Sequence, residues 1–190
     1  MVISLPVYLG VIAALAAERG VELAIAQRNA ARAFAAGAIE AGQGHYPAMV
    51  VFHSAFLVAC VIERVMRGHG APPAIAAIAV IAELFAQFLR YWVIFTLGPR
   101  WNTRIIVLPN APPVTGGPFR FLRHPNYVAV AIEMIAVPMI GGAWITAIAF
   151  SVGNGILMMF RIPAEERAMG KSYAGAFSAL PRFFPRIRHG

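Results

Sequence analysis

Long apolar stretches separated by arginine-containing polar segments constrain this chain more than any other feature. A helix needs about 20 apolar residues to cross the roughly 30 Å hydrocarbon layer of a bilayer. Hydrophobic residues make up 59% of the 190 residues and charged residues only 13%, a composition that does not fit a soluble domain. The pattern predicts one all-α integral membrane domain, residues 1–190, with about five transmembrane helices: Val2 to Ala17, Pro47 to Met66, Pro73 to Leu97, Asn126 to Ile140 and Ala143 to Phe160.

The distribution of basic residues predicts the orientation of these helices. Five crossings place the two termini on opposite sides of the membrane, and basic residues collect on the cytoplasmic side. With the amino terminus outside, the outer segments keep only Arg64 and Arg67, and nearly all other basic residues lie inside. We therefore expect the amino terminus outside and the carboxyl terminus in the cytoplasm.

The distribution of charge and the cysteine content exclude two other classes of function. The formal net charge of +8 is spread between apolar runs and forms no single basic face, so no nucleic-acid partner is expected. The sole cysteine, Cys60, lies inside an apolar run, so neither an internal disulfide nor a cysteine metal cluster is expected, and no metal site is predicted. Fifteen arginines against one lysine, with abundant alanine, are typical of a GC-rich bacterial genome. A bacterial inner (cytoplasmic) membrane is the expected location.

Two polar runs flank the last pair of apolar stretches, one from Gly117 to Tyr127 and the other from Arg161 to Glu166. Only Gly141-Gly142 separates the two stretches, so the helices must run antiparallel and pack as a tight hairpin. The hairpin brings both polar runs to the cytoplasmic side. Arginine, histidine and paired glutamates are costly beside lipid, so their gathering there predicts a site.

Two further segments are expected to complete this site. The connection from Gly98 to His124 contains several turn-forming pairs and is too long for a simple link, so we expect it to fold over the site. Residues Ala164 to Phe177 are predicted as a separate cytoplasmic helix, with Pro163 in its first turn. The chain then divides into substrate-side helices, residues 1–97, and a cofactor-binding half, residues 98–190.

The residue types in the polar runs suit a zwitterionic nucleoside such as S-adenosylmethionine. His124-Pro125 marks a helix start, whose free N–H groups can hold a carboxylate. Glu165 and Glu166 can accept hydrogen bonds from an ammonium group or ribose hydroxyls, and Tyr127 can favour a sulfonium by a cation–π contact. Each feature alone also has a simpler explanation, because arginines anchor helices to headgroups and acidic residues favour helix starts.

These runs resemble the isoprenylcysteine carboxyl methyltransferase family. Its hallmark is a Gly-Pro-aromatic-Arg stretch, then Arg-His-Pro-x-Tyr, a hairpin, and Arg-x-x-x-Glu-Glu; here the parts are Gly117 to Arg120, Arg123 to Tyr127 and Arg161 to Glu166. The tail run from Leu180 to Pro185 resembles the closing proline-aromatic segment of the family. A multi-part match in order is far more specific than Arg-His-Pro alone.

The resemblance implies a membrane-embedded methyltransferase that uses S-adenosylmethionine and lacks the Rossmann fold of soluble methyltransferases. Arg161 resembles the family arginine that lies near the reacting carboxylate, which makes it a candidate for both catalysis and substrate binding. The expected cofactor-binding residues are Arg123, His124, Pro125, Tyr127, Glu165 and Glu166.

The amino half adds candidates for the acceptor side. The segment from Gly42 to Pro47 resembles bacterial members of the family, some of which accompany polyketide synthases and O-methylate long-chain phenols or pyrones; His45 and Tyr46 are therefore expected substrate contacts, or else they form a turn before the second span. Glu133 lies inside the fourth span, where a lone acid is a functional candidate. It is expected to act as a base or to be a carboxyl group bonded to a neighbouring helix.

The predicted function is S-adenosylmethionine-dependent O-methylation of a lipophilic acceptor at the cytoplasmic face. The acceptor is an isoprenylcysteine-like carboxylate or a long-chain phenol or pyrone, a small molecule or prenylated substrate arriving from the surrounding membrane lipids. Alternatives are a phospholipid or amine N-methyltransferase, an NADPH-dependent sterol-type reductase, and a membrane protein without enzymatic activity.

Overall fold

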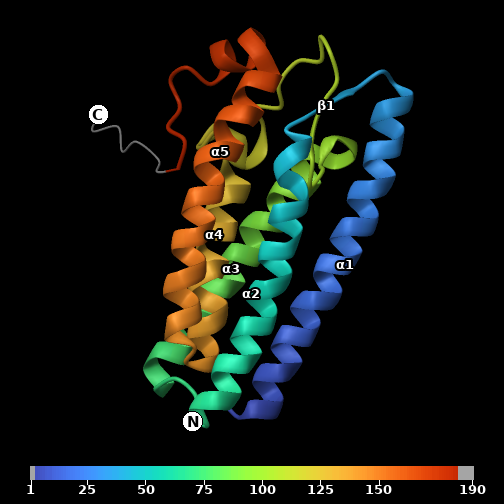
Figure 1. The fold of residues 1–190 in the computed structure, drawn as a ribbon. Helices are drawn as coiled ribbons and strands as arrows, with labels where there is room; N and C mark the ends of the chain where they lie inside the picture. Colours follow the sequence, from blue (N-terminus) through green and yellow to red (C-terminus); the bar gives the residue numbers. More distant parts are fainter. Residues whose placement is uncertain (1–2, 184–190) are drawn as a thin grey trace, which may run out of the picture.

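A computed structural model describes residues 3–183, except for the side chain of His45. Five long helices run side by side as a bundle, and two short strands lie at the end where α1 finishes (Figure 1). The long helices are α1 (Leu5–Ala35), α2 (Tyr46–Arg67), α3 (Pro73–Leu97), α4 (Pro125–Gly141) and α5 (Trp144–Ala176). The short elements are β1 (Ile39–Ala41), η1 (Gln43–His45), η2 (Gly98–Arg100), β2 (Ile105–Val107) and η3 (Gly117–Arg120).

Three of the helices are long and apolar enough to cross a membrane, namely α2, α3 with the adjoining η2, and α5. α4 is apolar but has only 17 residues, and α1 carries Glu18, Arg19 and Glu22 near its middle. Many large apolar side chains on the bundle are exposed, as expected for a surface that faces lipid. The chain is a helical membrane protein, whereas the count of five crossings and their orientation stay predictions.

Two expected helix ends are wrong. α1 does not stop at Ala17 but continues to Ala35, and Asn29 on its second half donates to the Trp101 carbonyl at 2.9 Å. The predicted separate helix from Ala164 to Phe177 is also incorrect, because α5 runs without interruption through Pro163. The helical backbone breaks later, at Gly170, where φ is 71° and ψ is −163°. Arginine, alanine and glutamate favour helix even after hydrophobic periodicity ends, which explains the first error.

The joint of the α4–α5 hairpin lies at Gly141-Gly142, as predicted, since α4 ends at Gly141 and α5 begins at Trp144. Gly142 has a left-handed backbone, with φ of 78°, and a Cβ there would lie 2.8 Å from the Ala71 backbone nitrogen. A Cβ on Gly141 would lie 2.4 Å from the ring of Tyr8, which is fully buried. Only glycine fits this joint, so the hairpin can pack closely against α1 and the turn between α2 and α3.

The strands fasten the long connection after α3 onto the bundle. β1 and β2 pair in antiparallel register, with Ile39 opposite Val107. Arg104, just before β2, forms an ion pair with Glu40 of β1 at 3.0 Å. The connection between α3 and α4 is thereby tied to the connection between α1 and α2 at one end of the bundle.

Candidate functional site

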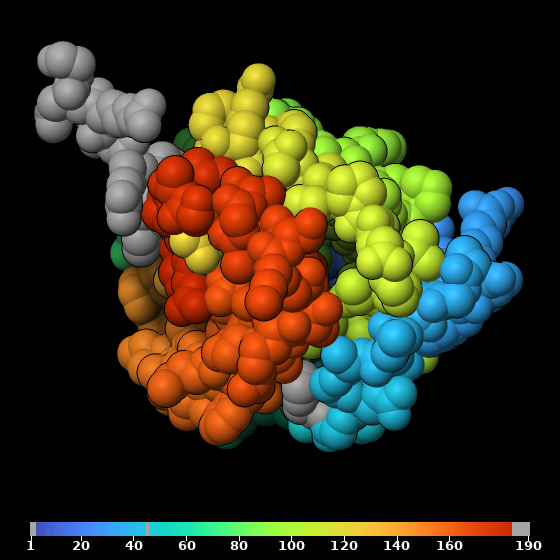
Figure 2. Space-filling model, turned by 90° about the horizontal axis from the view of Figure 1, so that it is seen from above, coloured from blue at the N-terminus to red at the C-terminus, as the bar shows by residue number. Residues whose placement is uncertain are grey.

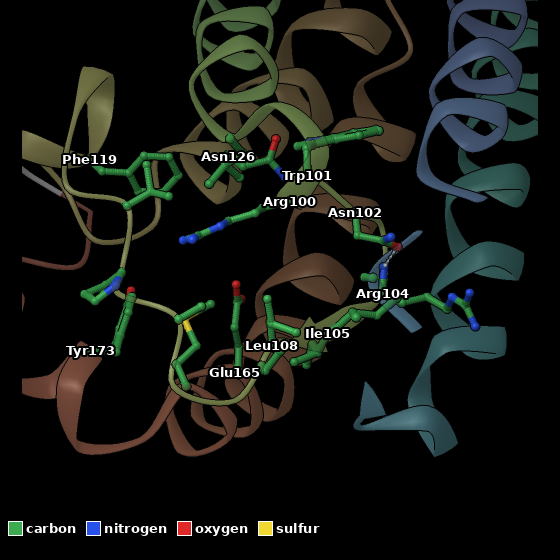
Figure 3. Close-up of a pocket in the computed structure, with 18 of the residues that line it drawn as sticks. Arg100, Trp101, Asn102, Arg104, Ile105, Leu108, Phe119, Asn126, Glu165 and Tyr173 are labelled. Atoms are coloured by element: carbon green, nitrogen blue, oxygen red, sulfur yellow. Dashed lines mark hydrogen bonds between the residues drawn. The ribbon is translucent and has the colours of Figure 1, made fainter. Parts of the chain in front are cut away.

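A cavity of about 390 Å³ lies at this end of the bundle, and we call it the first cavity. It is lined by the α3–α4 connection, by the start of α4 and by the later part of α5, and Figure 2 shows the surface hollowed between the yellow-green connection and the orange part of α5. Its volume falls in the range of roughly 300 to 1,000 Å³ that is usual for small-molecule sites. In Figure 3 the carboxylate of Glu165 points into it, with Arg100 and Asn126 on the facing side.

The two polar runs meet along one wall of the first cavity. Nε2 of His124, the residue before α4, lies 3.0 Å from Oε1 of Glu166 on α5. The Tyr127 hydroxyl donates to the Glu165 carboxylate. Pro125 occupies the first position of α4 and also lines the cavity. The prediction that the hairpin brings the two runs together is therefore confirmed.

Arg161 lies behind this wall and is almost fully buried, with 7% of its surface exposed. Its Nε donates to the Tyr127 hydroxyl oxygen at 2.9 Å, and one of its terminal nitrogens donates to the Thr103 carbonyl at 2.7 Å. The guanidinium is thus held between α4 and the α3–α4 connection by planar, directional bonds. A cation fixed in this way can hold an anionic oxygen in one position.

The residues after α5 fold back against the start of α4. Arg123 donates from Nε to the Leu180 carbonyl at 2.6 Å, and its backbone nitrogen donates to the Pro181 carbonyl at 3.0 Å. Arg182 donates to both oxygens of Glu166, at 3.0 and 2.6 Å. The hydrogen bond with Glu166 raises the pKa of Arg182 above its ordinary value. Arg123 lines the first cavity and at the same time anchors the tail.

A second cavity, of about 310 Å³, extends from the first into the bundle between α1, α2 and α4. Its lining is mostly apolar and includes Leu15, Met49, Val130 and Met134. The two cavities adjoin, because both are lined by Trp101, Asn102, Asn126, Tyr127 and Arg161. The two cavities thus share one wall, which contains two of the predicted site residues, Tyr127 and Arg161.

The remaining candidates lie around the second cavity. Tyr46 lines it, and its hydroxyl lies 3.2 Å from the Thr103 hydroxyl. Glu133 also lines it and is ion-paired with Arg90 of α3, while Gln87 donates to it at 3.1 Å. The side chain of His45 lies outside the described part of the structure. Glu133 and Arg161 line the same cavity, but Glu133 belongs to a separate group of charges deeper in the bundle.

Sequence reasoning missed several residues of the shared wall. Asn126 stands inside the Arg-His-Pro-Asn-Tyr motif but received no role, although its buried Oδ1 has no hydrogen-bond partner among the described residues. Trp101 and Asn102 follow α3 in a stretch without a motif.

Two residues of the second cavity were also misplaced. Arg19 and Glu22 line the second cavity, yet they were expected outside the bundle because the first helix was expected to end at Ala17.

Comparisons with known proteins place these features in a family. Residues 77–171 match the model of the isoprenylcysteine carboxyl methyltransferase family. The protein YpbQ of Bacillus subtilis (strain 168) is 35% identical over 158 residues, which cover 83% of this chain and 94% of the relative. A protein of Haemophilus influenzae (strain ATCC 51907 / DSM 11121 / KW20 / Rd) is 28% identical over 158 residues, 83% of this chain and 91% of its own length. Both relatives are described as uncharacterized, so they extend the similarity beyond the matched segment without naming an activity.

Proposed function

The chain belongs to the isoprenylcysteine carboxyl methyltransferase family, and from this premise we propose that it methylates an oxygen of a lipophilic acceptor with S-adenosylmethionine as donor. Membership of the family supports methyltransferase activity in a membrane protein. The observation that carries the finer proposal is the pair of adjoining cavities, with Tyr127 and Arg161 in their shared wall and with more polar surface in the first cavity than in the second. Adjoining cavities of this kind let two bound reactants meet at the wall between them.

The first cavity fits the donor by its chemistry. S-adenosylmethionine supplies a methyl group on a positively charged sulfonium and carries an ammonium group, a carboxylate, ribose hydroxyls and an adenine. The buried Asn126 Oδ1 has no partner among the described residues and can accept from such donors. The Glu165 carboxylate points into the cavity (Figure 3), and carboxylates form strong hydrogen bonds with ammonium and hydroxyl groups.

We assign the polar residues around the first cavity to holding the donor. The backbone N–H of Asn126 at the start of α4 would bind an anionic group, Glu165 would accept from groups that donate, and Glu166 holds His124 and Arg182 in place. Tyr127 presents an aromatic face to positive charge. Arg123 supports donor binding indirectly, because its hydrogen bond to the Leu180 carbonyl holds the residues after α5 beside the cavity. The complete donor set is Arg123, His124, Pro125, Tyr127, Glu165 and Glu166.

We assign Arg161 to the acceptor. Its charge is buried at the wall between the cavities, so an acceptor in the second cavity would place its oxygen anion against the guanidinium and toward the first cavity. Fixing the two reactants in line and excluding water supply most of the rate in such a site, because a carboxylate or enolate already carries the attacking charge. Tyr46 lines the same chamber and would contact the acceptor.

The identity of the acceptor decides whether a base is needed. A carboxylate such as that of an isoprenylcysteine is already ionised, whereas a long-chain phenol must lose a proton during or before transfer. His45 and Glu133 are the proposed candidates for that proton. The ion pair between Glu133 and Arg90 occupies one oxygen of the carboxylate, and Gln87 donates to the other, so a proton transfer to Glu133 would have to displace one of these partners.

The test is methyl transfer by single variants in nanodiscs. We expect Arg161→Gln to lower kcat/KM on the order of a hundredfold, because a charge-assisted contact to the acceptor is lost. Glu133→Gln should lower the rate for a phenol and leave the rate for a carboxylate nearly unchanged. Arg167→Gln is the control, since Arg167 is an exposed arginine on the same helix. Undiminished turnover in both Arg161→Gln and Glu133→Gln would remove the catalytic assignment.

A further inference from the structure

Four charged side chains from three helices meet inside the bundle and line the second cavity. They are Arg19 and Glu22 of α1, Arg90 of α3 and Glu133 of α4, and we call them the charged cluster. Arg19 pairs with Glu22 at 2.9 Å and with Glu133 at 3.5 Å, and Arg90 pairs with Glu133 and lies 3.7 Å from Glu22. Burying such charges is costly unless they are fully bonded or serve a function.

The charged cluster is not fully bonded. Oε1 of Glu22 and Nε of Arg90 are buried and have no hydrogen-bond partner among residues 3–183. Both residues are 5% exposed, and both line the second cavity. A buried acceptor and a buried donor left open beside one cavity are groups that a bound molecule can satisfy, since most buried polar atoms in proteins have a partner.

The two open groups define the chemistry of that molecule. Oε1 of Glu22 requires a hydrogen-bond donor, and the Nε–H of Arg90 requires an acceptor. A hydroxyl group does both at once, whereas an ammonium group can only donate and a ketone can only accept. The rest of the lining, with Leu15, Val130, Met134 and Val137, suits a hydrocarbon chain around the hydroxyl group.

The position of the charged cluster sets the distance between the two polar groups of that molecule. Glu133 follows Tyr127 by six residues on α4, which is roughly 9 Å along the helix axis. Arg161 contacts Tyr127, whereas Arg90 of the charged cluster pairs with Glu133. A molecule that reaches from one to the other has two polar groups separated by about this distance.

We propose that the charged cluster is a specificity site that binds a hydroxyl group on the acceptor, about 9 Å from the oxygen that is methylated. The inference rests on the proposed function in one respect, that the second cavity holds the acceptor. Glu22 and Arg90 are the residues that bind the hydroxyl group, and Arg19 and Glu133 hold them in place. The acceptor is accordingly an amphiphile with two polar groups and not a lipid with a single polar head.

Binding of matched amphiphiles tests the proposal without requiring turnover. The probes are palmitate and 4-dodecylphenol, each compared with a counterpart that carries one hydroxyl group on the chain about 9 Å from the head group. Affinity is measured by titration calorimetry on the full chain in nanodiscs. The wild type should bind the hydroxylated member of at least one pair about tenfold tighter, as one hydrogen bond to charged groups implies.

The variants separate recognition from structural support. Glu22→Gln should reduce the preference to under about threefold, and Glu22→Leu should abolish it. Glu18→Gln is the matched control, because Glu18 also pairs with Arg19, at 3.2 Å, but does not line the cavity; it should keep the full preference. If Glu22→Leu fails to fold, the comparison of Glu22→Gln with Glu18→Gln still separates hydroxyl recognition from structural support.

Several outcomes overturn the proposal. Equal wild-type affinity within both probe pairs would do so, as would equal losses of preference in Glu22→Gln and Glu18→Gln, which assign the charged cluster to structure alone. Tighter binding of an amine-bearing counterpart than of the hydroxylated one would also contradict it. Hydroxyl preference without any methyl transfer would contradict the proposed function and leave this site standing, whereas methyl transfer without the preference would do the reverse.

Discussion

Arg161 donates from Nε to the Tyr127 hydroxyl oxygen at 2.9 Å, and this contact stands in the wall shared by the two cavities. The Tyr127 hydroxyl group in turn donates a hydrogen bond to Glu165, which lines the first cavity. A continuous chain of three hydrogen-bonded side chains, Arg161, Tyr127 and Glu165, therefore connects the second cavity with the first. Under the proposed function, this chain fixes the position of the acceptor relative to the donor.

Removing the hydroxyl group of Tyr127 should break the chain. In Tyr127→Phe, Arg161 loses one of its anchors and Glu165 loses its partner, so we expect kcat/KM for methyl transfer to fall by roughly tenfold to a hundredfold. The fold should persist, because the aromatic ring is kept. Tyr91→Phe is the control, since Tyr91 is 40% exposed on α3 and lines neither cavity. Equal activity of both variants would show that the hydroxyl group has no positioning role.

Replacing Glu166 should weaken cofactor binding more than replacing its exposed partner Arg182. Glu166→Gln removes the charge that binds His124 and Arg182, so the affinity for S-adenosylhomocysteine should fall about tenfold. Arg182→Gln should have a smaller effect that disappears at high salt, because the Arg182 side chain is 49% exposed and its ion pair is screened. Titration calorimetry at low and high salt measures both. A larger loss in Arg182→Gln than in Glu166→Gln would contradict the assignment of Glu166 to the cofactor.

Replacing Gly141 at the end of α4, even by alanine, should destabilise the protein. A Cβ in Gly141→Ala meets the buried ring of Tyr8 at 2.4 Å, and overpacking of this kind costs about 1–3 kcal/mol of unfolding free energy. Gly155→Ala on α5 is the matched control, because a Cβ there meets nothing within 4 Å. It should be neutral or stabilise by up to about 1 kcal/mol through helix propensity. Thermal unfolding in detergent compares the two, and equal midpoints would rule out the close approach.

Glu63 of α2 caps the start of α5 at the opposite end of the bundle. Its carboxylate accepts from the backbone nitrogens of Ile145 and Thr146, at 3.0 and 2.7 Å, and from the Thr146 hydroxyl. Glu63→Ala should therefore lower the unfolding free energy by about 1–2 kcal/mol, as loss of a helix cap does. Arg67→Gln should cost less than about 1 kcal/mol, because Arg67 only pairs with Glu63 near the surface. Equal losses in the two variants would contradict the capping role.

The sequence predicted the carboxyl half of the molecule more closely than the amino half. The Gly141-Gly142 joint, the meeting of His124 with Glu166 and the membrane character follow from apolar length and from the spacing of polar runs. These are local signals, since the two arms of a hairpin without a linker have few ways to pack.

The errors arose where tertiary contacts decide the structure. Helix α1 continues past Ala17 because residues with high helix propensity follow, and two of its charged side chains, Arg19 and Glu22, line the second cavity. Glu22 is buried only because Arg19 and Arg90 lie beside it, and the latter residue is on another helix. Helix α5 likewise continues through Pro163 directly after two buried residues, Arg161 and Ile162, and hydropathy alone does not predict this continuation.

The chemistry of the labelled product tests the central claim most directly. The protein in nanodiscs is supplied with methyl-labelled S-adenosylmethionine and with several acceptors: palmitate, 4-dodecylphenol, the counterparts of both that carry a hydroxyl group on the chain, and an amine-headgroup phospholipid. The organic extract is then separated into O-methyl and N-methyl lipids. We predict label in an O-methyl product of the wild type and its reduction about a hundredfold in Arg161→Gln. Label in N-methyl lipids alone would contradict O-methylation. No label in lipid, together with no thermal stabilisation by S-adenosylhomocysteine, would contradict the account as a whole.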